Sequence, residues 1–218
     1  MIKIEKTAVM NILNAVRGAR NPLNSWSKSD SGYSDDAAAI PFIGSNDLKL
    51  LQSLCKAGSD HRKFMRQIFV SADITAPLYW WKEFDTYKVG TTANSTSTMH
   101  KIHSKPISIE DFSCDCLTEA DFEMFNLYIA YIENLRLKFI ETNDKSIWDR
   151  IIQMLPCNYH QLRTVTCSYE NLLNMYYARK SHKLSEWRLF CNWIETLPYA
   201  EELIISIKGP AKHPNHTA

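Results

Sequence analysis

The stretch Ala76-Pro77-Leu78-Tyr79-Trp80-Trp81-Lys82-Glu83-Phe84-Asp85-Thr86-Tyr87-Lys88 combines a proline with a cluster of aromatic residues. Proline is favoured at the first position of a helix, where its missing N–H costs nothing, so the sequence predicts a helix from Pro77 through about Tyr87. With about 100° between successive residues, the aromatic side chains of this helix share one arc. Such an arc is typical of core packing, with stacking on a flavin or a base as the second interpretation.

Glu83 lies inside the same arc, about 40° around the helix axis from Tyr79. A carboxylate there needs a partner, because burying it unpaired is strongly destabilising. Two interpretations follow. Glu83 is either half of a structural ion pair or tyrosine hydrogen bond, or an acid that faces a ligand.

The segments on either side of this helix alternate between strand and helix patterns. Together they predict an α+β domain over residues 1–208, with a small mixed or antiparallel sheet wrapped by helices. The polar, proline-containing tail 209–218 is expected to be disordered. The predicted strands are 1–6, 67–74 and 162–167, and 91–98 is expected to be a loop or a strand. The predicted helices are 9–18, 47–57, 77–87, 119–139, 144–155, 169–179 and 185–197, and a long, mobile loop is expected over 21–43.

Local signals set several of these boundaries. Asn46 or Asp47 is expected to cap the second helix, and Gly58 to end it. Thr118-x-x-Asp121 resembles a capping box before a long helix. The buried stripe expected on that long helix comprises Phe122, Phe125, Ile129, Ile132 and Phe139.

The composition excludes several classes of protein. The 218 residues include 25 Lys and Arg against 24 Asp and Glu, a formal net charge of +1. This balance provides no basic stripe for nucleic-acid phosphates, and no apolar stretch is long enough to cross a bilayer. The six cysteines form no CxxC pair, so we interpret them as reduced thiols of a cytoplasmic protein.

One group of residues has partly metal-like spacing, His100-x-x-His103 followed by Cys114-x-Cys116. Zinc sites normally use a CxxC-type chelate, whose loop fits tetrahedral geometry. The favoured interpretation is scattered polar residues in a loop, and no metal is predicted.

A segment rich in hydroxyl groups runs from Gly90 to His100, with Lys88 and Lys101 on either side. Hydroxyls and an asparagine suit contacts with phosphate, sugar or amide groups. Solvated turn residues explain the same composition, because Ser, Thr and Asn prefer turns. The chain contains no glycine-rich phosphate-binding fingerprint.

Several features occur in a characteristic order: a strand, a proline-started aromatic helix, the hydroxyl-rich segment, Leu155-Pro156, Thr164-Val165-Thr166 and Leu172-Leu173-Asn174-x-x-x-x-Arg179. This order resembles the flavin-dependent thymidylate synthases, the ThyX family, over most of residues 7–197. The family signature R-H-R-x-x-S-x-N-x-x-S-x-R aligns with residues 87–99. We call residues 87–99 the signature segment. Asn94 and Ser97 match the signature and Thr92 is a conservative exchange, whereas its three arginines and its histidine are absent.

The resemblance implies a set of functional residues and partners. It implies reductive methylation of dUMP to dTMP, with FAD as the cofactor and methylenetetrahydrofolate and NADPH as co-substrates. It also implies a homotetramer, which would accommodate Asn174 and Arg179 pointing about 140° apart on one helix. The implied catalytic residues are Arg179 and Glu83, the implied cofactor-binding residues are Asn174, Ser168 and His61, and the implied substrate-binding residues are Lys88, Thr92, Asn94, Ser97 and Arg179.

Two alternatives accompany this interpretation. The missing arginines favour a divergent relative that keeps the fold and binds a nucleotide, a flavin or a protein without synthase activity. The stretch Leu155-Pro156-Cys157-Asn158-Tyr159-His160-Gln161 resembles the nucleophile loop of the folate-only thymidylate synthases. An unreactive cysteine is the default for Cys157, because a thiolate nucleophile needs a cationic setting.

Overall fold

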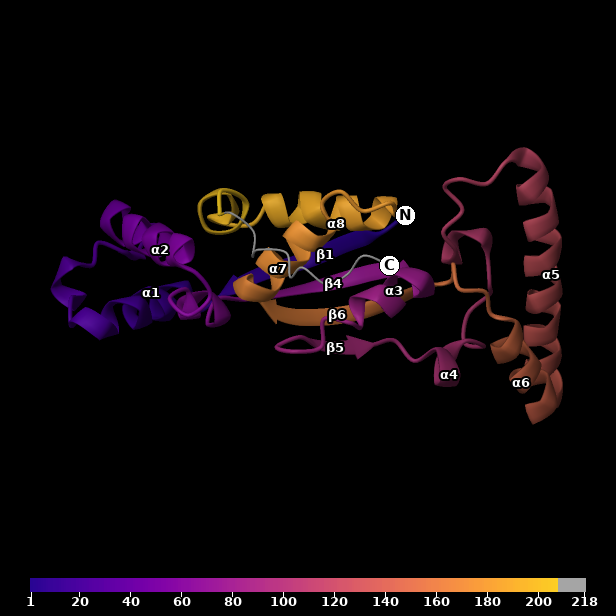
Figure 1. Ribbon diagram of the computed structural model, residues 1–218. Helices are drawn as coiled ribbons and strands as arrows, with labels where there is room; N and C mark the ends of the chain where they lie inside the picture. Colours follow the sequence, from indigo (N-terminus) through magenta and orange to yellow (C-terminus); the bar gives the residue numbers. More distant parts are fainter. Residues whose placement is uncertain (208–218) are drawn as a thin grey trace. The chain divides into compact units, whose positions relative to one another are not determined.

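Strands and helices mix along the chain in the computed structural model, which describes residues 1–207 (Figure 1). Four strands form one sheet in the order β1-β4-β6-β5, and β2 pairs with β3 in an antiparallel ribbon. The predicted α+β class is therefore confirmed. The strands are β1 (Lys3–Met10), β2 (Gly32–Tyr33), β3 (Pro41–Phe42), β4 (Phe69–Pro77), β5 (Thr92–Ser95) and β6 (His160–Ser168). The α-helices are α1 (Ile12–Arg20), α2 (Ser45–Ala57), α3 (Leu78–Phe84), α4 (Thr98–Lys101), α5 (Glu119–Thr142), α6 (Lys145–Met154), α7 (Tyr169–Arg179) and α8 (Ser185–Glu195).

The chain forms two compact units. Among the described residues, unit 1 comprises 1–5, 73–86 and 93–164, and unit 2 comprises 6–72, 87–92 and 165–207. The expected single domain over 1–208 stays a prediction, and the expected disordered tail 209–218 lies outside the described residues.

Strand β4 extends further than the sequence predicts, and the helix after it is shorter. Alternate residues of β4 are buried, as a strand with one face in the core requires. Pro77 has extended backbone angles and serves as the N-cap of α3 rather than its first residue. The N–H of Leu78 donates to the carbonyl of Tyr159 at 3.0 Å, which holds the start of α3. The helix ends at Phe84 rather than near Tyr87.

The aromatic side chains of α3 form a core, as the favoured interpretation predicts. Trp80, Trp81 and Phe84 are almost completely buried. The rings of Trp80 and Phe84 stack with their centroids 5.1 Å apart, and the Trp81 ring meets Trp80 edge to face at 4.9 Å. These rings are therefore packed against one another and are not presented to a ligand.

Helix α5 packs against the neighbouring α6 in unit 1 (Figure 1). The capping box predicted for α5 is present, with Thr118 and Asp121 each accepting from the other's backbone N–H. Ile129 and Ile132 are buried as predicted, and Ile151 of α6 joins the same cluster. Phe122 is exposed, contrary to the prediction, because the buried part of α5 begins only at Ile129.

Helices α7 and α8 pack together in unit 2, where Arg62 and Glu170 form a buried ion pair. The Arg62 guanidinium donates to both carboxylate oxygens of Glu170, from Nε at 2.9 Å and from Nη2 at 3.0 Å. Such a fork fixes the direction of both side chains. The pair thereby holds the turn before β4 against the first turn of α7.

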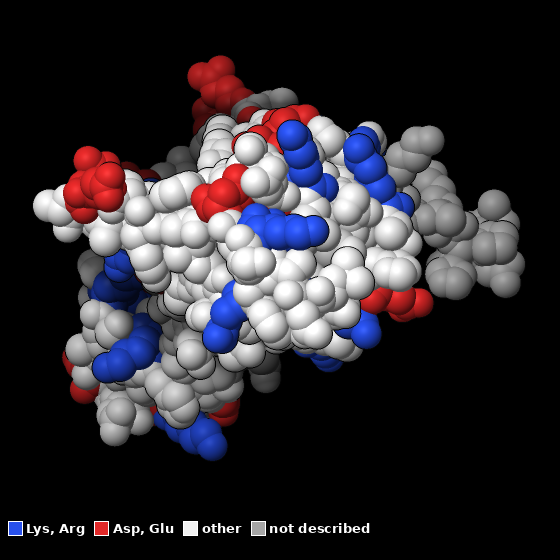
Figure 2. Space-filling model, turned by 90° about the vertical axis from the view of Figure 1, so that its left-hand side faces the viewer, with Lys and Arg blue, Asp and Glu red and all other residues white. Residues whose placement is uncertain are grey.

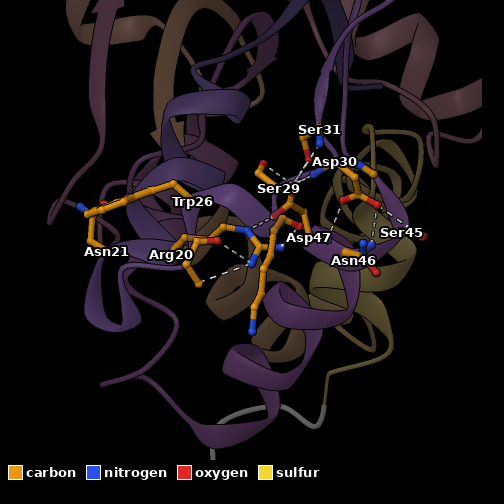
Figure 3. Close-up of polar contacts among 12 residues, drawn as sticks. Arg20, Asn21, Trp26, Ser29, Asp30, Ser31, Ser45, Asn46 and Asp47 are labelled. Atoms are coloured by element: carbon orange, nitrogen blue, oxygen red, sulfur yellow. Dashed lines mark hydrogen bonds and ion pairs between the residues drawn. The ribbon is translucent and has the colours of Figure 1, made fainter.

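The predicted loop 21–43 is organised by hydrogen bonds to Asp47 (Figure 3). The Asp47 carboxylate is fully buried and accepts from Arg20 Nε at 2.5 Å and from the hydroxyl of Ser31 at 2.6 Å. The backbone N–H groups of Asp30 and Ser31 also donate to it, each at 3.1 Å. Hydrogen bonds to the Asp47 carboxylate therefore order this loop, together with the pairing of β2 and β3.

The expected cap of α2 is wrong, since the helix begins at Ser45 after Gly44. The Asp30 carboxylate, from the preceding loop, accepts from the N–H groups of Asn46 at 2.9 Å and Asp47 at 3.0 Å. Asp30 therefore caps the N-terminus of α2, although it is not adjacent to that helix in the sequence. A Cβ atom at Gly44 would lie 2.3 Å from Asp30, so only glycine fits there.

The surface carries charges of both signs. On the face shown in Figure 2, acidic and basic side chains are interspersed among uncharged residues. This pattern agrees with the formal net charge of +1. Within residues 1–207, no helix combines the length and the apolar character needed to cross a membrane.

Candidate functional site

The start of the signature segment is fixed to helix α7 by Asn171. Its amide Nδ2 donates to the carbonyl of Val89 at 2.7 Å, and its Oδ1 accepts from the hydroxyl of Ser168, also at 2.7 Å. The next residue, Gly90, has a φ of 73°, a left-handed conformation that favours glycine. A Cβ at Gly90 would lie 3.1 Å from Asn171 Oδ1. The turn that begins the segment is thus specified by both residues.

Arg179, the last residue of α7, is held by aromatic residues. Its Nε donates to the hydroxyl of Tyr87 at 2.8 Å. Its guanidinium lies over the ring of Trp187, 4.6 Å from the centroid, and 5.5 Å from that of Tyr87. This arrangement provides a half-buried, oriented cation in contact with the first residue of the signature segment.

The residues implied to bind flavin have different surroundings. Ser168 is buried and is the N-cap of α7, where its hydroxyl bonds to Asn171. Asn174 is half-buried on α7, and no hydrogen bond joins its side chain to another described residue. His61 is exposed in the turn before the 3-10 helix Lys63–Arg66, next to the buried Arg62.

The residues implied to bind substrate are mostly exposed. Lys88 and Thr92 lie in the part of the segment that belongs to unit 2, and Asn94 and Ser97 in the part that belongs to unit 1. The Ser97 hydroxyl accepts from the N–H of His100 at 3.1 Å, so it caps the short helix α4. Glu83 is half-buried on α3 in unit 1 and has an interaction partner.

Ser97 lines a cavity of about 390 Å³ in unit 1, here called the signature cavity. Hydroxyl groups and two lysines face the cavity from the signature segment and the residues after it. Other lining residues come from the end of the 3-10 helix at Ile109–Asp111 and from the start of β6. The members that matter for its chemistry are Thr96, Ser97, Thr98, Lys101, Lys105, Glu110, Asp111, Tyr159 and His160.

The charges in the signature cavity follow from local contacts. Lys105 pairs with Asp111, and this hydrogen bond raises the pKa of the ammonium group. Burial lowers the pKa of His160, which shares a hydrogen bond of 2.9 Å with Ser113. Burial also raises the pKa of the Tyr159 phenol. At neutral pH the cavity therefore offers the Lys101 cation, the Lys105–Asp111 ion pair, the Glu110 carboxylate, hydroxyls and neutral rings, a set that suits a sugar or a phosphate held by Lys101.

The remaining candidates for chemistry are possible metal ligands and the cysteines. The residues that the structure describes contain no group of three or more His, Cys, Asp or Glu able to hold a metal ion. All six cysteines are free thiols. Burial raises the pKa of Cys55, Cys167 and Cys191 to about 12, which leaves them unreactive. Cys157 is exposed.

Solved structures of other proteins share this architecture. Two crystal structures of thymidylate synthase X (ThyX) from Helicobacter pylori with FAD and dUMP give TM-scores of 0.68 and 0.67 at 16% and 18% identity. They cover 94% of this chain and 97% and 99% of their own. The chain has a ThyX-like fold. A UMP/dUMP methylase, PolB from Streptomyces cacaoi bound with 5-Br dUMP, gives 0.61 at 13% identity, covering 96% of this chain and 97% of its own. No family profile and no curated protein matches the sequence.

Within this ThyX-like fold, the predicted site residues fall into two groups. Unit 2 contains Arg179, Asn174, Ser168, His61, Lys88 and Thr92, and unit 1 contains Glu83, Asn94 and Ser97. Sequence reasoning missed Asn171, Tyr87 and Trp187 as positioning residues, and Lys105 in the signature cavity. The spacing Ser168-x-x-Asn171 is a helix-start signal that could have identified Asn171.

Proposed function

We propose that this protein binds dUMP and acts as a flavin-dependent thymidylate synthase-like enzyme. The observation that carries the proposal is the ThyX-like fold, which extends over 94% of the chain in the comparison with a structure named as containing FAD and dUMP. The reaction would consume dUMP, methylenetetrahydrofolate and NADPH, and yield dTMP, tetrahydrofolate and NADP⁺. Bound FAD would supply the hydride for the reductive step, and the protein would bind and orient the reactants.

The nucleotide would use the polar groups of the signature segment. Lys101 would attract its phosphate in the signature cavity, together with Lys105, which is paired with Asp111, and Ser97 and Thr98 add hydroxyls. The resemblance further implies Arg179 and Lys88 as contacts of the uracil or the phosphate, and Thr92, Asn94 and Glu83 as further nucleotide contacts. Lysine provides the positive charge of the missing arginines but not their bidentate hydrogen bonds, so weaker nucleotide binding is expected.

The residues implied for flavin fit that cofactor in part. The Asn174 amide is half-buried and makes no hydrogen bond to another described residue, so it is available to the polar edge of a flavin ring. The exposed His61 is available as well. Ser168 fits less well, because Asn171 already uses its hydroxyl. Asn174 and His61 would therefore hold the cofactor, and Ser168 would support the helix that carries Asn174.

The absence of the signature arginines and histidine favours a second candidate function. A relative that keeps the fold and binds nucleotide or flavin without catalysis would need no arginine to stabilise a reaction. In that case the present protein would bind dUMP but would not convert it to dTMP.

The deciding experiment starts with the absorption spectrum of the purified protein, which reveals retained flavin. Protein incubated with FAD is then supplied with dUMP, methylenetetrahydrofolate and NADPH without oxygen, and dTMP is quantified by chromatography. Formation of dTMP supports the enzyme. Binding of dUMP in calorimetry without dTMP formation supports the second function, and failure to bind either FAD or dUMP contradicts both.

We also propose that the protein assembles as a homotetramer in the cytoplasm. A site shared between subunits would allow Asn174 and Arg179, which project about 140° apart on α7, to serve different ligand groups. Light scattering tests the assembly. A mass near 25.2 kDa, that of one chain, would contradict it.

A further inference from the structure

A second cavity in unit 1, here called the histidine cavity, has a volume of about 470 Å³. It lies among α4, the end of α5 and the start of α6, and shares no lining residue with the signature cavity. Its size is within the usual range for small-molecule sites. Nothing in the proposed dUMP chemistry uses it.

Aromatic rings form the walls of the histidine cavity. Phe139 of α5 and Trp148 of α6 both line it and are only half-buried. The ring of His103 meets Phe139 edge to face, with centroids 5.0 Å apart. Partly exposed rings in a concave site favour a planar aromatic ligand, which can stack on them or meet their edges.

His103 has an unsatisfied polar atom at this cavity. Its Nδ1 is shielded from solvent and has no hydrogen-bond partner among the described residues. The residue itself is held in place, because Arg136 Nη1 donates to its backbone carbonyl at 3.1 Å. Buried nitrogen atoms are normally paired, so this unpaired one indicates a hydrogen bond that a ligand completes when the imidazole turns toward the cavity.

The charge around the histidine cavity favours an anion. Lys145, the first residue of α6, lines it, together with His100 and Asn143. The N-terminus of α6 is already capped by the Asp144 carboxylate, which accepts from the N–H of Ser146 at 2.8 Å, so the positive charge at the cavity comes from the Lys145 side chain. None of the described lining residues is acidic.

We propose that the histidine cavity binds a small planar aromatic acid. The ring of the ligand contacts Phe139 and Trp148, and its carboxylate accepts a hydrogen bond from Lys145 and, with the imidazole turned toward the cavity, one from the Nδ1–H of His103. This site is separate from the proposed dUMP site, so the two can be tested independently.

Calorimetry with 2-naphthoate as the probe tests this proposal on the full chain. We expect a dissociation constant below about 1 mM, a modest affinity for a ligand of this size. His103→Phe keeps a ring against Phe139 but removes the nitrogen, and Lys145→Ala removes the cation. Each should weaken binding by about fivefold or more, and the neutral analogue 2-naphthylmethanol should bind the wild type more weakly by a similar factor.

Two control variants locate the bound probe. Lys138→Ala removes an exposed lysine of α5 outside the cavity and should leave the affinity unchanged. Lys101→Ala changes the signature cavity and should also have no effect. A loss of affinity in Lys101→Ala equal to that in Lys145→Ala would place the probe in the signature cavity and overturn the proposal.

A direct spectroscopic signal covers the case in which His103→Phe does not fold. In the wild type, the ¹⁵N resonance of His103 Nδ1 should move as 2-naphthoate is added. An unmoved resonance overturns the proposal, as does the absence of binding at millimolar probe or an equal affinity in folded His103→Phe.

Discussion

Arg179 Nε donates a hydrogen bond of 2.8 Å to the hydroxyl of Tyr87, which joins the end of α7 to the first residue of the signature segment. The ring of Trp187 lies against the same guanidinium at 4.6 Å. The cation is therefore oriented by the protein itself. If Arg179 binds a nucleotide as proposed, binding would cost less side-chain entropy than ordering a mobile arginine.

Replacing Arg179 by alanine should weaken dUMP binding by about 1.5–3 kcal/mol, the contribution of a hydrogen bond to a charged group, without unfolding the protein. Calorimetry on the two proteins measures the change. Lys180→Ala is the matched control, since Lys180 is exposed and follows Arg179 directly. Equal affinities in wild type and Arg179→Ala would restrict Arg179 to packing on Trp187.

Glu83→Gln should melt within a few degrees of the wild type, because Glu83 is only half-buried on α3. Glutamine keeps the shape and an acceptor oxygen, so nucleotide binding should persist. Differential scanning calorimetry with and without dUMP gives both quantities, with Glu123→Gln, at an exposed position of α5, as control. Destabilisation by about 3–5 kcal/mol with unchanged dUMP affinity would show that Glu83 belongs to a structural ion pair.

The Arg62–Glu170 pair should show strong coupling. Arg62→Met alone leaves the Glu170 carboxylate buried and unpaired, and should lower the free energy of unfolding by about 3–5 kcal/mol. Adding Glu170→Met should restore much of that loss, because neither charge then remains. Urea unfolding of the wild type, both single variants and the double variant provides a complete cycle. Additive losses would contradict the coupling.

Asp47 should make stability depend on pH in the acidic range. Burial alone would raise its pKa, but hydrogen bonds from Ser31, Ser29 and Arg20 hold it below the ordinary value of 3.8. A carboxyl whose pKa is depressed by folding contributes stability above its unfolded pKa, and that contribution disappears as pH falls through the folded pKa. The stability conferred by Asp47 should therefore be complete at neutral pH and decline below 3.8.

Urea midpoints of wild type and Asp47→Asn at several pH values test this dependence. We expect Asp47→Asn to have a free energy of unfolding about 3–5 kcal/mol below that of the wild type near neutral pH, because Arg20 loses its buried partner. In acid this difference in stability should be smaller. Asp35→Asn, at an exposed position of the loop 21–43, should have the same urea midpoints as the wild type. Parallel curves for wild type and Asp47→Asn over the whole range would contradict the assignment.

Local chemistry made much of the fold predictable. The capping pair Thr118 and Asp121 identified the start of α5, and Pro198 limited the end of α8. The role of Asp47 was not predictable, because its partners lie 16 to 27 residues away and are brought together by a loop without periodicity. The local sequence predicted Asp47 as a helix cap, whereas in the folded protein its carboxylate is a buried hydrogen-bond acceptor.

The candidate site was less predictable than the fold. Family resemblance implied Arg179 and Ser97 as site residues. The hydrogen bond between Arg179 and Tyr87 was not predictable, because the two residues are 92 positions apart in the sequence. Lys105 joined the signature cavity only through folding, since nothing in its local sequence differs from that of an ordinary surface lysine. Hydroxyl-rich composition indicated where polar contacts lie, whereas their convergence depended on the chain around them.

The contacts of Asn171 have an evolutionary consequence. One amide accepts from Ser168, donates to Val89 and crowds the position where a Gly90 side chain would be. Losing Asn171 would release the crowding but leave Gly90 with its left-handed φ of 73° and remove the tie on which that turn depends. Substitutions at 90, 168 and 171 should therefore be epistatic, so that the order in which they arise decides which sequences remain accessible to the lineage.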